Sequence, residues 1–459
     1  MAKGRLARCL ALALLFAAAA ATAADRVQPA VLPQLLLPAM ALTAQDVAVV
    51  VNDADPASVE LGAFYAEARR IAPERVLHVR FPPGRSTLTA DEFRQAKVEL
   101  DAKVPVQVQA YALAWTQPYR VDCMSITAAF AFGFDSRYCA DGCQPTRLSA
   151  YFDSDSIAPF KDFGVRPAML LAARDLAEAK ALIARGVRSD ERWPAGRAYL
   201  MRTSDSQRDV RSAGYAQVRA VLGAAYPIDV IRADALRDRA DVMFYFTGLA
   251  QVPAIETNRF LDGALADHLT SVGGELLGGA QMSVLDWIHA GATGSYGTAL
   301  EPCNFRQKFP DVGVAMARYL SGETLLEAYW KSVQMPGQGV FVGEPLARPF
   351  GGQRAARVGA EMEVRTRALR PGRYWIQSAP SGVGPYRTTA TINVTAYGVQ
   401  RIRLPATPPW TYRIVREGAG VGTGAAAGES STAWSVLRMP PQARSSANTS
   451  GDSTSRGSR

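Results

Sequence analysis

The sequence predicts an α/β protein, with mainly parallel sheets flanked by helices in two subdomains and a small antiparallel β domain near the C-terminal end. Three observations predict this class. Short apolar runs, several of them rich in valine, alternate with amphipathic segments along most of the chain. Many of these runs end in polar turn residues, as buried parallel strands do. After residue 351, short alternating runs separated by Pro and Gly are typical of antiparallel strands.

The first 23 residues predict a signal peptide. Three basic residues precede an apolar run from Cys9 to Ala21, and Ala21-Thr22-Ala23 is a small-residue cleavage site. The alternative is an uncleaved anchor, but the apolar run is short for a bilayer, and no later stretch approaches the roughly 20 apolar residues of a membrane span. We therefore expect an exported protein, periplasmic or extracellular, without a transmembrane segment after cleavage.

The charge balance argues against a nucleic-acid partner. The formal net charge of +9 falls to +6 when the three basic residues of the signal peptide are removed. We expect this mild excess to be spread along the chain, and no run of basic residues marks a nucleic-acid face.

Local patterns predict the individual elements. Residues 46–52 form a strand and 57–71 a helix, and Thr89 caps the next helix. Further helices are expected over 176–187 and 207–225, and over 312–334 with a break at Gly322. The predicted organisation is a signal peptide (1–23), an N-terminal α/β subdomain (45–122), a disulfide-linked connection (123–162), a second α/β subdomain (163–351), a β-sandwich-like domain (360–416) and a disordered tail (417–459).

Four cysteines remain after signal cleavage, and an even count in an exported protein predicts two disulfides. Four cysteines allow three pairings. The preferred pairing joins Cys139 to Cys143, which closes the small loop CADGC, and Cys123 to Cys303. A metal site on Cys-x3-Cys is the weaker alternative because no histidine lies nearby, so we expect no metal and no cofactor.

The stretch from Leu261 to Asn304 concentrates the candidate functional residues. It contains two of the three histidines, one cysteine and several glycines, and its pattern predicts a strand, a glycine loop, a helix and another strand. Ligands in open α/β sheets bind beyond the carboxyl ends of the strands, so we expect the functional site here.

The segment from 166 to 205 resembles the catalytic subdomain of gingipain-type cysteine peptidases, which share the caspase-like fold. The similar features are Ala173 at a strand end, Ala177-Glu178-Ala179 at a helix start, Trp193, and Asp205 at the next strand end. The resemblance is one of element order over residues 45–416. It implies a caspase-like fold, with a histidine after one strand and a cysteine nucleophile after the next.

Several motifs are also similar to an uncharacterised family of exported bacterial proteins associated with exosortase, a membrane protein-sorting system. The motifs are DHLTS, GGAQMSVLDWIHAGATGSYGT, EPCN, QKFP, EAYWKSV and PGQGVFVGEPLARPF. This resemblance implies a cell-envelope context with an unknown protein or peptide partner, and it implies no reaction.

The caspase-like site looks degenerate in this sequence. Thr247-Gly248 stands where His-Gly is expected, and Thr270 or Ser271, followed by Gly273-Gly274, stands where the nucleophile is expected. A hydroxyl needs an activating base more than a thiol does, because it is almost wholly protonated at neutral pH.

Two catalytic pairs could still give an active site, and both use His268 as the base. It lies close in sequence to Ser271, beside Asp267 and before Glu275, but in a strand it points away from the Ser271 side. The second catalytic pair is His268 with Cys303. The structural alternatives are that His268 packs the strand end and that Cys303 is a disulfide partner.

The remaining candidates have structural explanations of equal or greater weight. His78 within a strand and His289 at a helix end are explained structurally, and the glycines by tight packing. Tyr296, Glu301 and Asn304 follow a strand end and line a pocket or satisfy buried backbone groups.

Two hypotheses follow. The first is a cell-envelope recognition or scaffold component, with a caspase-like fold and a degenerate site, linked to exosortase-type sorting or surface-polymer export. The alternative is an active hydrolase, a peptidase with an atypical Ser, Thr or Cys nucleophile. The candidate catalytic residues are Ser271, His268 and Thr247, and the candidate binding cleft comprises Gly248, Thr270, Gly273, Gly274, Glu275, Tyr296, Glu301 and Asn304.

Overall fold

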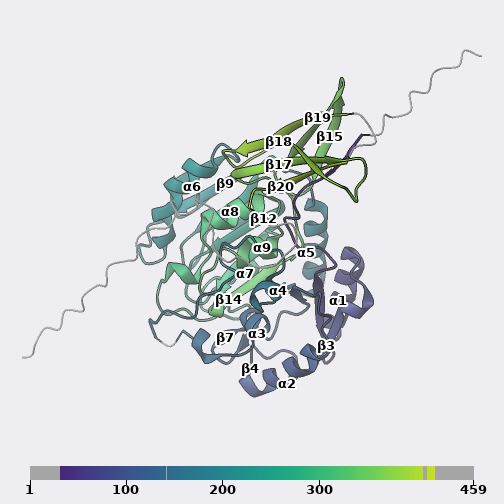
Figure 1. Ribbon diagram of the computed structural model, residues 1–459. Coiled ribbons are helices and arrows are strands. Elements are labelled where there is room, and N and C mark those ends of the chain that lie inside the picture. Colours follow the sequence, from purple (N-terminus) through teal and green to yellow (C-terminus); the bar gives the residue numbers. More distant parts are fainter. Residues whose placement is uncertain (1–31, 141, 407–410, 419–459) are drawn as a thin grey trace, which may run out of the picture.

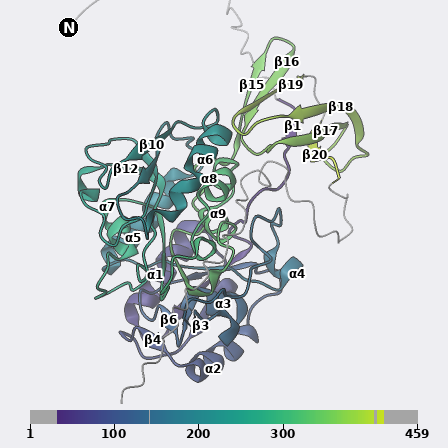
Figure 2. The ribbon, with the colours of Figure 1, turned by 90° about the vertical axis from the view of Figure 1, so that its left-hand side faces the viewer.

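The computed structural model describes residues 32–140, 142–406 and 411–418. The predicted signal peptide and nearly all of the predicted tail lie outside the described residues. Within these ranges the chain forms an α/β body and a smaller β domain, which lies at one end of the body (Figures 1 and 2). None of the described helices is long and apolar enough to cross a membrane.

The body is built on one ten-stranded sheet, in which eight of the nine neighbouring strand pairs are parallel and only the central pair, β13 with β14, is antiparallel. The five strands on one side of this central contact therefore run opposite to the five on the other side. Most of its strands are buried along their whole length, as the valine-rich runs predict. In spatial order the strands are β10 (Ile228–Arg232), β9 (Arg197–Arg202), β11 (Val242–Thr247), β12 (Phe260–His268), β13 (Gly294–Thr298), β14 (Gly339–Gly343), β8 (Ala168–Leu170), β5 (Ala110–Leu113), β2 (Val47–Asn52) and β3 (Val76–Val79).

Strand β14 joins the two regions that the sequence divides into subdomains. It pairs antiparallel with β13, where Val342 lies opposite Ser295, and parallel with β8, where Val342 lies opposite Leu170. Both regions therefore supply strands to a single sheet. The large, mostly parallel sheet with helices confirms the α/β class.

Helices cover both faces of this sheet. Helices α5 and α7 lie on one side and α8 and α9 on the other (Figure 2). The helices are α1 (Pro56–Arg69), α2 (Ala90–Asp101), α3 (Ile126–Phe132), α4 (Pro159–Phe163), α5 (Leu176–Ser189), α6 (Tyr215–Leu222), α7 (Val284–Ala290), α8 (Val312–Leu320) and α9 (Leu325–Trp330). Short 3-10 helices span Pro73–Arg75, Ser136–Tyr138, Asp209–Gly214, Ile255–Thr257, Arg306–Lys308 and Pro336–Gln338.

The helix boundaries follow local capping chemistry. Thr89 and Glu92 form a capping box at the start of α2, as expected for a threonine in this position. Gly322 adopts a φ of +86° between α8 and α9, which confirms the expected break. The helix expected over 207–225 begins only at Tyr215, because the Asp205 carboxylate accepts the backbone N–H groups of Gln207 and Arg208 and holds a turn there.

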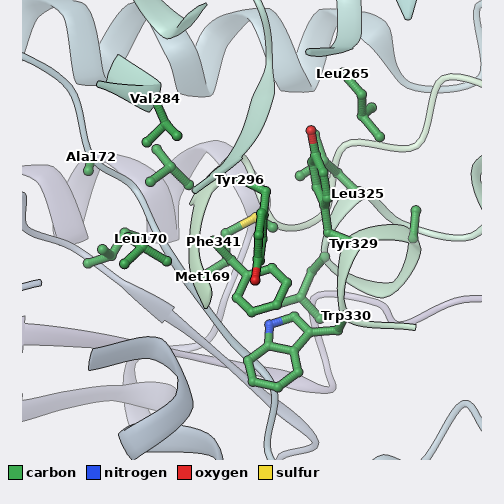
Figure 3. Packing of buried hydrophobic residues seen from close by; sticks show 14 of the residues in the cluster. Met169, Leu170, Ala172, Leu265, Val284, Tyr296, Leu325, Tyr329, Trp330 and Phe341 are labelled. Atoms are coloured by element: carbon green, nitrogen blue, oxygen red, sulfur yellow. The ribbon is translucent and has the colours of Figure 1, made fainter. Parts of the chain in front are cut away.

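Aromatic side chains fill the core between the sheet and α9 (Figure 3). Trp330 of α9 stacks on Phe341 of β14 with ring centroids 4.4 Å apart, and Tyr296 of β13 meets Phe341 edge-on at 4.9 Å. These three side chains are completely buried. They fix β13, β14 and α9 against one another and so fix the strands that support the candidate site.

The connection over 123–162 is more ordered than the sequence suggests. Its apolar segment ITAAFAF forms α3, which Ser125 caps by accepting the backbone N–H of Ala128. Thr127 of this helix donates to the carbonyl of Gly339 at 2.5 Å, so the segment packs directly on the sheet. A three-stranded ribbon of β4 (Thr87–Leu88), β6 (Arg120–Val121) and β7 (Met124–Ser125) precedes it.

The C-terminal β domain consists of two small sheets around a separate apolar cluster. Its first strand after the body begins at Gln353, and its sheets include β1 from the N-terminal leader, which pairs with β20. One sheet contains β15 (Gln353–Val358), β16 (Glu361–Thr366) and β19 (Gln400–Pro405); the other contains β1 (Gln34–Leu36), β20 (Thr411–Arg416), β17 (Gly372–Ala379) and β18 (Arg387–Val394).

Candidate functional site

The carboxyl ends of β9, β11, β12 and β13 converge at one edge of the sheet. Thr247 at the end of β11 lies opposite His268 at the end of β12. Beyond these ends is a pocket of about 360 Å³, which we call the rim pocket. Its lining residues are Gln207, Arg208, Leu269, Thr270, Ser271, Glu301, Pro302, Cys303, Asn304 and Phe309.

The predicted strand, glycine loop, helix and strand over 261–304 are confirmed. They correspond to β12, a turn-rich segment, α7 and β13. The loop is packed tightly where its glycines occur: the N–H of Gly274 donates to the carbonyl of Thr298 at 2.9 Å. A Cβ at Gly274 would lie 2.8 Å from the Thr298 backbone, and one at Gly273 would lie 3.4 Å from the His268 ring. These glycines therefore permit close packing and do not line the pocket.

His268 is completely buried, and both of its ring nitrogens are occupied. The indole N–H of Trp287 donates to its Nδ1 at 2.9 Å, so the ring proton lies on Nε2, which is 3.1 Å from the carbonyl of Met282. Burial lowers the pKa of His268 to about 4, so the ring is neutral at physiological pH. A ring held in this way has no free nitrogen to accept a proton from Ser271.

The Thr270 hydroxyl is also engaged. It donates to the side-chain oxygen of Gln281 at 2.7 Å and accepts from Nε of Arg208 at 3.0 Å. The same Gln281 oxygen accepts the backbone N–H of Val272 at 2.9 Å, so it fixes the turn after β12. Thr270 therefore shapes the pocket wall.

Ser271 is the hydroxyl that remains available in the rim pocket. It is half-buried, and its side chain makes no hydrogen bond to the residues described in the structure. Its carbonyl accepts the backbone N–H of Glu301 at 2.9 Å and the Thr298 hydroxyl at 3.0 Å. These bonds hold the backbone of Ser271 against the end of β13.

Thr247 and Gly248 lie next to the pocket and support it. Thr247 is buried, and its carbonyl accepts from the guanidinium of Arg211 at 2.7 Å. A Cβ at Gly248 would lie 2.0 Å from the carbonyl oxygen of Arg208, so only glycine allows this approach. In the described part of the chain the Thr247 hydroxyl has no hydrogen-bond partner, and it does not line the rim pocket.

The four cysteines form two disulfides, but the preferred pairing is wrong. The structure joins Cys123 to Cys139 and Cys143 to Cys303. The short 3-10 helix Ser136–Tyr138 brings Cys139 back beside β7, near Cys123, which leaves Cys143 to reach the pocket rim. Cys303 is thus oxidised and is no partner for His268.

Glu301 forms the polar floor of the pocket. Its carboxylate lies 2.6 Å from Nζ of Lys308, and both side chains are almost fully buried. Burial raises the pKa of Glu301, and Lys308 opposes this shift. At the exposed rim, the side-chain amide of Asn304 donates to the carbonyl of Gln207 at 2.8 Å.

Tyr296 and Glu275 do not line the rim pocket. Tyr296 is completely buried and donates to the carbonyl of Lys308. Glu275 is half-buried in the glycine loop. The other two histidines lie outside the site: His78 is 2.6 Å from Asp53, and His289 is 2.8 Å from Glu178.

Two groups of the site were not expected from the sequence. Gln207 and Arg208 enter the pocket from the turn after β9, where the polar run TSDSQRD at a strand end was a usable signal. Arg211 forms a buried ion pair with Asp267 at 2.6 Å behind the pocket. Nothing in the sequence pairs these two residues, because they are far apart in the chain.

Among the described residues, no group of three or more His, Cys, Asp or Glu side chains is arranged to hold a metal ion. The fold and the site define an α/β protein with a polar pocket at the carboxyl ends of β9, β11, β12 and β13, in a large, mostly parallel sheet. No protein-family model matches the chain, and no curated protein or solved structure matches it.

Proposed function

We propose that this protein is an exported recognition or scaffold component of the cell envelope that binds a protein or peptide segment in the rim pocket without cleaving it. The proposal includes a caspase-like fold with a degenerate active site and a link to exosortase-type sorting or surface-polymer export. Its support is the element order and the motifs over 261–350, together with the chemistry of the pocket.

The observation that carries the proposal is the environment of His268. A general base needs a nitrogen within hydrogen-bonding reach of the nucleophile and a pKa near the working pH. His268 has its nitrogens engaged by Trp287 and Met282, and its pKa is about 4. With Cys303 in a disulfide, the described residues of the pocket contain no activated nucleophile.

The pocket offers groups that suit a polypeptide. Arg208 at the wall supplies guanidinium donors, and the Ser271 hydroxyl can donate or accept. Asn304 lies exposed at the rim, where its carbonyl oxygen can accept from a peptide N–H. Such groups recognise main-chain amides and carboxylates and require no reaction.

One observation favours the alternative, an active hydrolase: the Ser271 hydroxyl lies in the pocket without a hydrogen bond to the described residues. A serine at the end of a parallel strand is a suitable position for a nucleophile. This alternative requires a base that activates Ser271 and therefore requires chemical labelling of Ser271 by serine-directed probes.

Site-specific cross-linking tests the proposed binding. A photo-reactive phenylalanine analogue at the exposed rim position of Pro302 is expected to cross-link an envelope polypeptide, while the same analogue at the exposed Val98 on α2 is not. Arg208→Ala in the first variant should reduce the cross-linked product by about tenfold, because a hydrogen bond from a charged group contributes roughly 1.5–3 kcal/mol. Equal products at both positions, or no effect of Arg208→Ala, would contradict binding in the rim pocket.

A further inference from the structure

The positive charge of the chain is concentrated in the C-terminal β domain. Residues 353–417 contain eleven arginines, no lysine and three glutamates, which gives a net charge of +8. Residues 32–352 contain 32 basic and 36 acidic residues, which gives −4. The excess is therefore not spread along the chain, as the sequence pattern suggested, and it consists of arginine alone in this domain.

Three of these arginines form a row across one sheet. Arg354 of β15 lies directly opposite Arg365 of β16, and Arg365 lies directly opposite Arg401 of β19. Directly opposite residues in antiparallel strands share a face and have Cβ atoms about 5 Å apart. The face is the outer one, because the alternate residues Met362, Val364, Ile402 and Leu404 are buried in the apolar cluster.

In the described part of the protein, no acidic side chain forms an ion pair with the three arginines of this row. Arg354 donates to the carbonyl of Arg192 at 3.1 Å and lies over the Trp193 ring. Arg365 and Arg401 have no hydrogen bond or ion pair with any described residue, and Nε of the half-buried Arg365 is enclosed without a partner. Like charges directly opposite each other are destabilising, so the row weakens the sheet unless an anion binds it.

The neighbouring charges leave the row cationic. On the same side, Glu363 of β16 lies 3.4 Å from Arg403 of β19 and is neutralised by it. Glu361 follows on the same side of β16, so the face carries four arginines and two glutamates and keeps a net charge of +2. Arg367, which follows β16, is half-buried over Phe350 and Trp193. We call the outward side of β15, β16 and β19 the arginine face.

The arginine face is separate from the rim pocket. Trp193, which Arg354 covers, precedes β9, whereas Gln207 of the rim pocket follows the same strand. The two surfaces therefore lie toward opposite edges of the main sheet. Binding at the arginine face goes beyond the proposed function and does not depend on it.

We propose that the arginine face binds an acidic polysaccharide that bears carboxylate groups. Neighbouring strands are about 4.8 Å apart, which is close to the length of one sugar ring, so a chain crossing the strands brings successive acidic sugars to successive arginines. The planar guanidinium binds a carboxylate through two parallel hydrogen bonds, and lysine, which this domain lacks, does not.

Other polyanions fit the face less well. Single-stranded nucleic acid binds through aromatic platforms on which bases stack, and the described aromatic ring beside the row, Trp193, is covered by Arg354 at 4.6 Å. Attachment to a membrane surface is stabilised by large apolar side chains that insert among the lipids. The outward positions beyond the row hold Ala356 and Glu363, and then Val358 and Glu361, so the one large aliphatic side chain of β15 on this side lies opposite a carboxylate.

The test measures binding of the mature chain to immobilised polygalacturonate at low salt, with neutral dextran as the reference. Wild-type protein is expected to bind polygalacturonate and not dextran, and to be released by salt because the contacts are ionic. Arg401→Gln and Arg365→Gln are each expected to weaken binding by about tenfold, since each removes a charge-assisted pair.

Arg357→Gln is the matched control. It changes the same charge on β15, but Arg357 lies opposite Met362 and therefore belongs to the other face of the strand. It should change affinity less than about twofold, within the range expected for a distant surface charge. Arg401 is exposed, so its variant should also keep or raise the melting temperature, which separates lost binding from lost folding.

Three results would overturn the proposal. These are no binding to polygalacturonate, equal losses in Arg357→Gln and Arg401→Gln, or tighter binding to single-stranded DNA, polyglutamate or anionic phospholipid vesicles than to polygalacturonate. Arg208→Ala in the rim pocket should leave polygalacturonate binding unchanged. A failure here therefore remains distinguishable from a failure of the rim-pocket function.

Discussion

The disulfide between Cys143 and Cys303 should stabilise the protein more than the one between Cys123 and Cys139. The first closes a loop with a sequence separation of 160 and the second a loop with a separation of 16. Loop-closure entropy in the unfolded chain predicts a stabilisation of about 5 kcal/mol for the long loop and about 3 kcal/mol for the short one. Removing the long-range disulfide should therefore cost about 2 kcal/mol more.

The assay compares two double variants, Cys143→Ala with Cys303→Ala and Cys123→Ala with Cys139→Ala. Urea unfolding of the body, followed by circular dichroism, measures the free energy of unfolding of each. The first variant is expected to unfold at the lower urea concentration, because its unfolded chain gains more freedom. An equal cost, or a larger cost for the short loop, would refute the reasoning.

Peptide mapping under non-reducing conditions checks the pairing itself. We expect one cross-linked peptide that contains Cys143 and Cys303 and another that contains Cys123 and Cys139. A fragment that links Cys139 to Cys143 would restore the pairing preferred from the sequence.

Three further predictions concern buried charges and the imidazole. Burial lowers the pKa of His268 to about 4, below its ordinary value of about 6.5. The unfolded chain therefore binds a proton at a higher pH than the folded protein does, so the free energy of unfolding is highest above pH 6.5 and falls by about 3 kcal/mol as the pH decreases toward 4. His268→Gln, whose amide can replace both hydrogen bonds, should remove this loss in urea titrations at pH 7 and pH 4.5, and an unchanged pH dependence would contradict it. Lys308→Met should cost about 3–5 kcal/mol because it leaves the Glu301 carboxylate buried without a cation, with only the backbone N–H of Cys303, among the described residues, still donating to it. Adding Glu301→Gln should recover part of this cost in thermal unfolding, whereas strictly additive losses would contradict the ion pair. Asp155 lies 2.7 Å from Arg416 of the β domain, so Asp155→Asn should speed limited proteolysis between body and β domain, and an unchanged rate would show that this contact does not hold them together.

The elements of the body could be predicted because each has a local cause. The buried run VAVVVN can form a strand within any parallel sheet, and Thr89 with Glu92 specifies a helix start within four residues. The sequence also predicted correctly that the candidate stretch over 261–304 forms a strand, a turn-rich loop, a helix and a strand, which contain β12, α7 and β13. Local pattern was less informative at Gln207, where the Asp205 side chain competes with the helix for backbone N–H groups.

Features that depend on distant residues could not be predicted. The leader strand β1 pairs with β20, and α3 packs on β14, across hundreds of residues of chain in each case. The predicted disulfide pairing was wrong for the same reason. Proximity in the sequence favoured a small loop between Cys139 and Cys143, whereas the fold brings Cys303 to Cys143.

In the candidate site, too, features with a local cause could be predicted and features that depend on distant residues could not. Ser271, Thr270, Glu301 and Asn304 were identified from their positions after strand ends, and the structure brings them together in the rim pocket. The environment of His268 depends on Trp287 of the next helix, which only the packed fold reveals.

The central claim is that the rim pocket binds and does not cut. The most direct measurement is labelling of the folded mature protein by a fluorophosphonate probe at neutral pH, with intact-mass detection and Ser271→Ala as the reference. Because His268 cannot accept the Ser271 proton, we expect no mass increase in either protein beyond that of a denatured sample. A single adduct on the folded wild type that disappears in Ser271→Ala would contradict it.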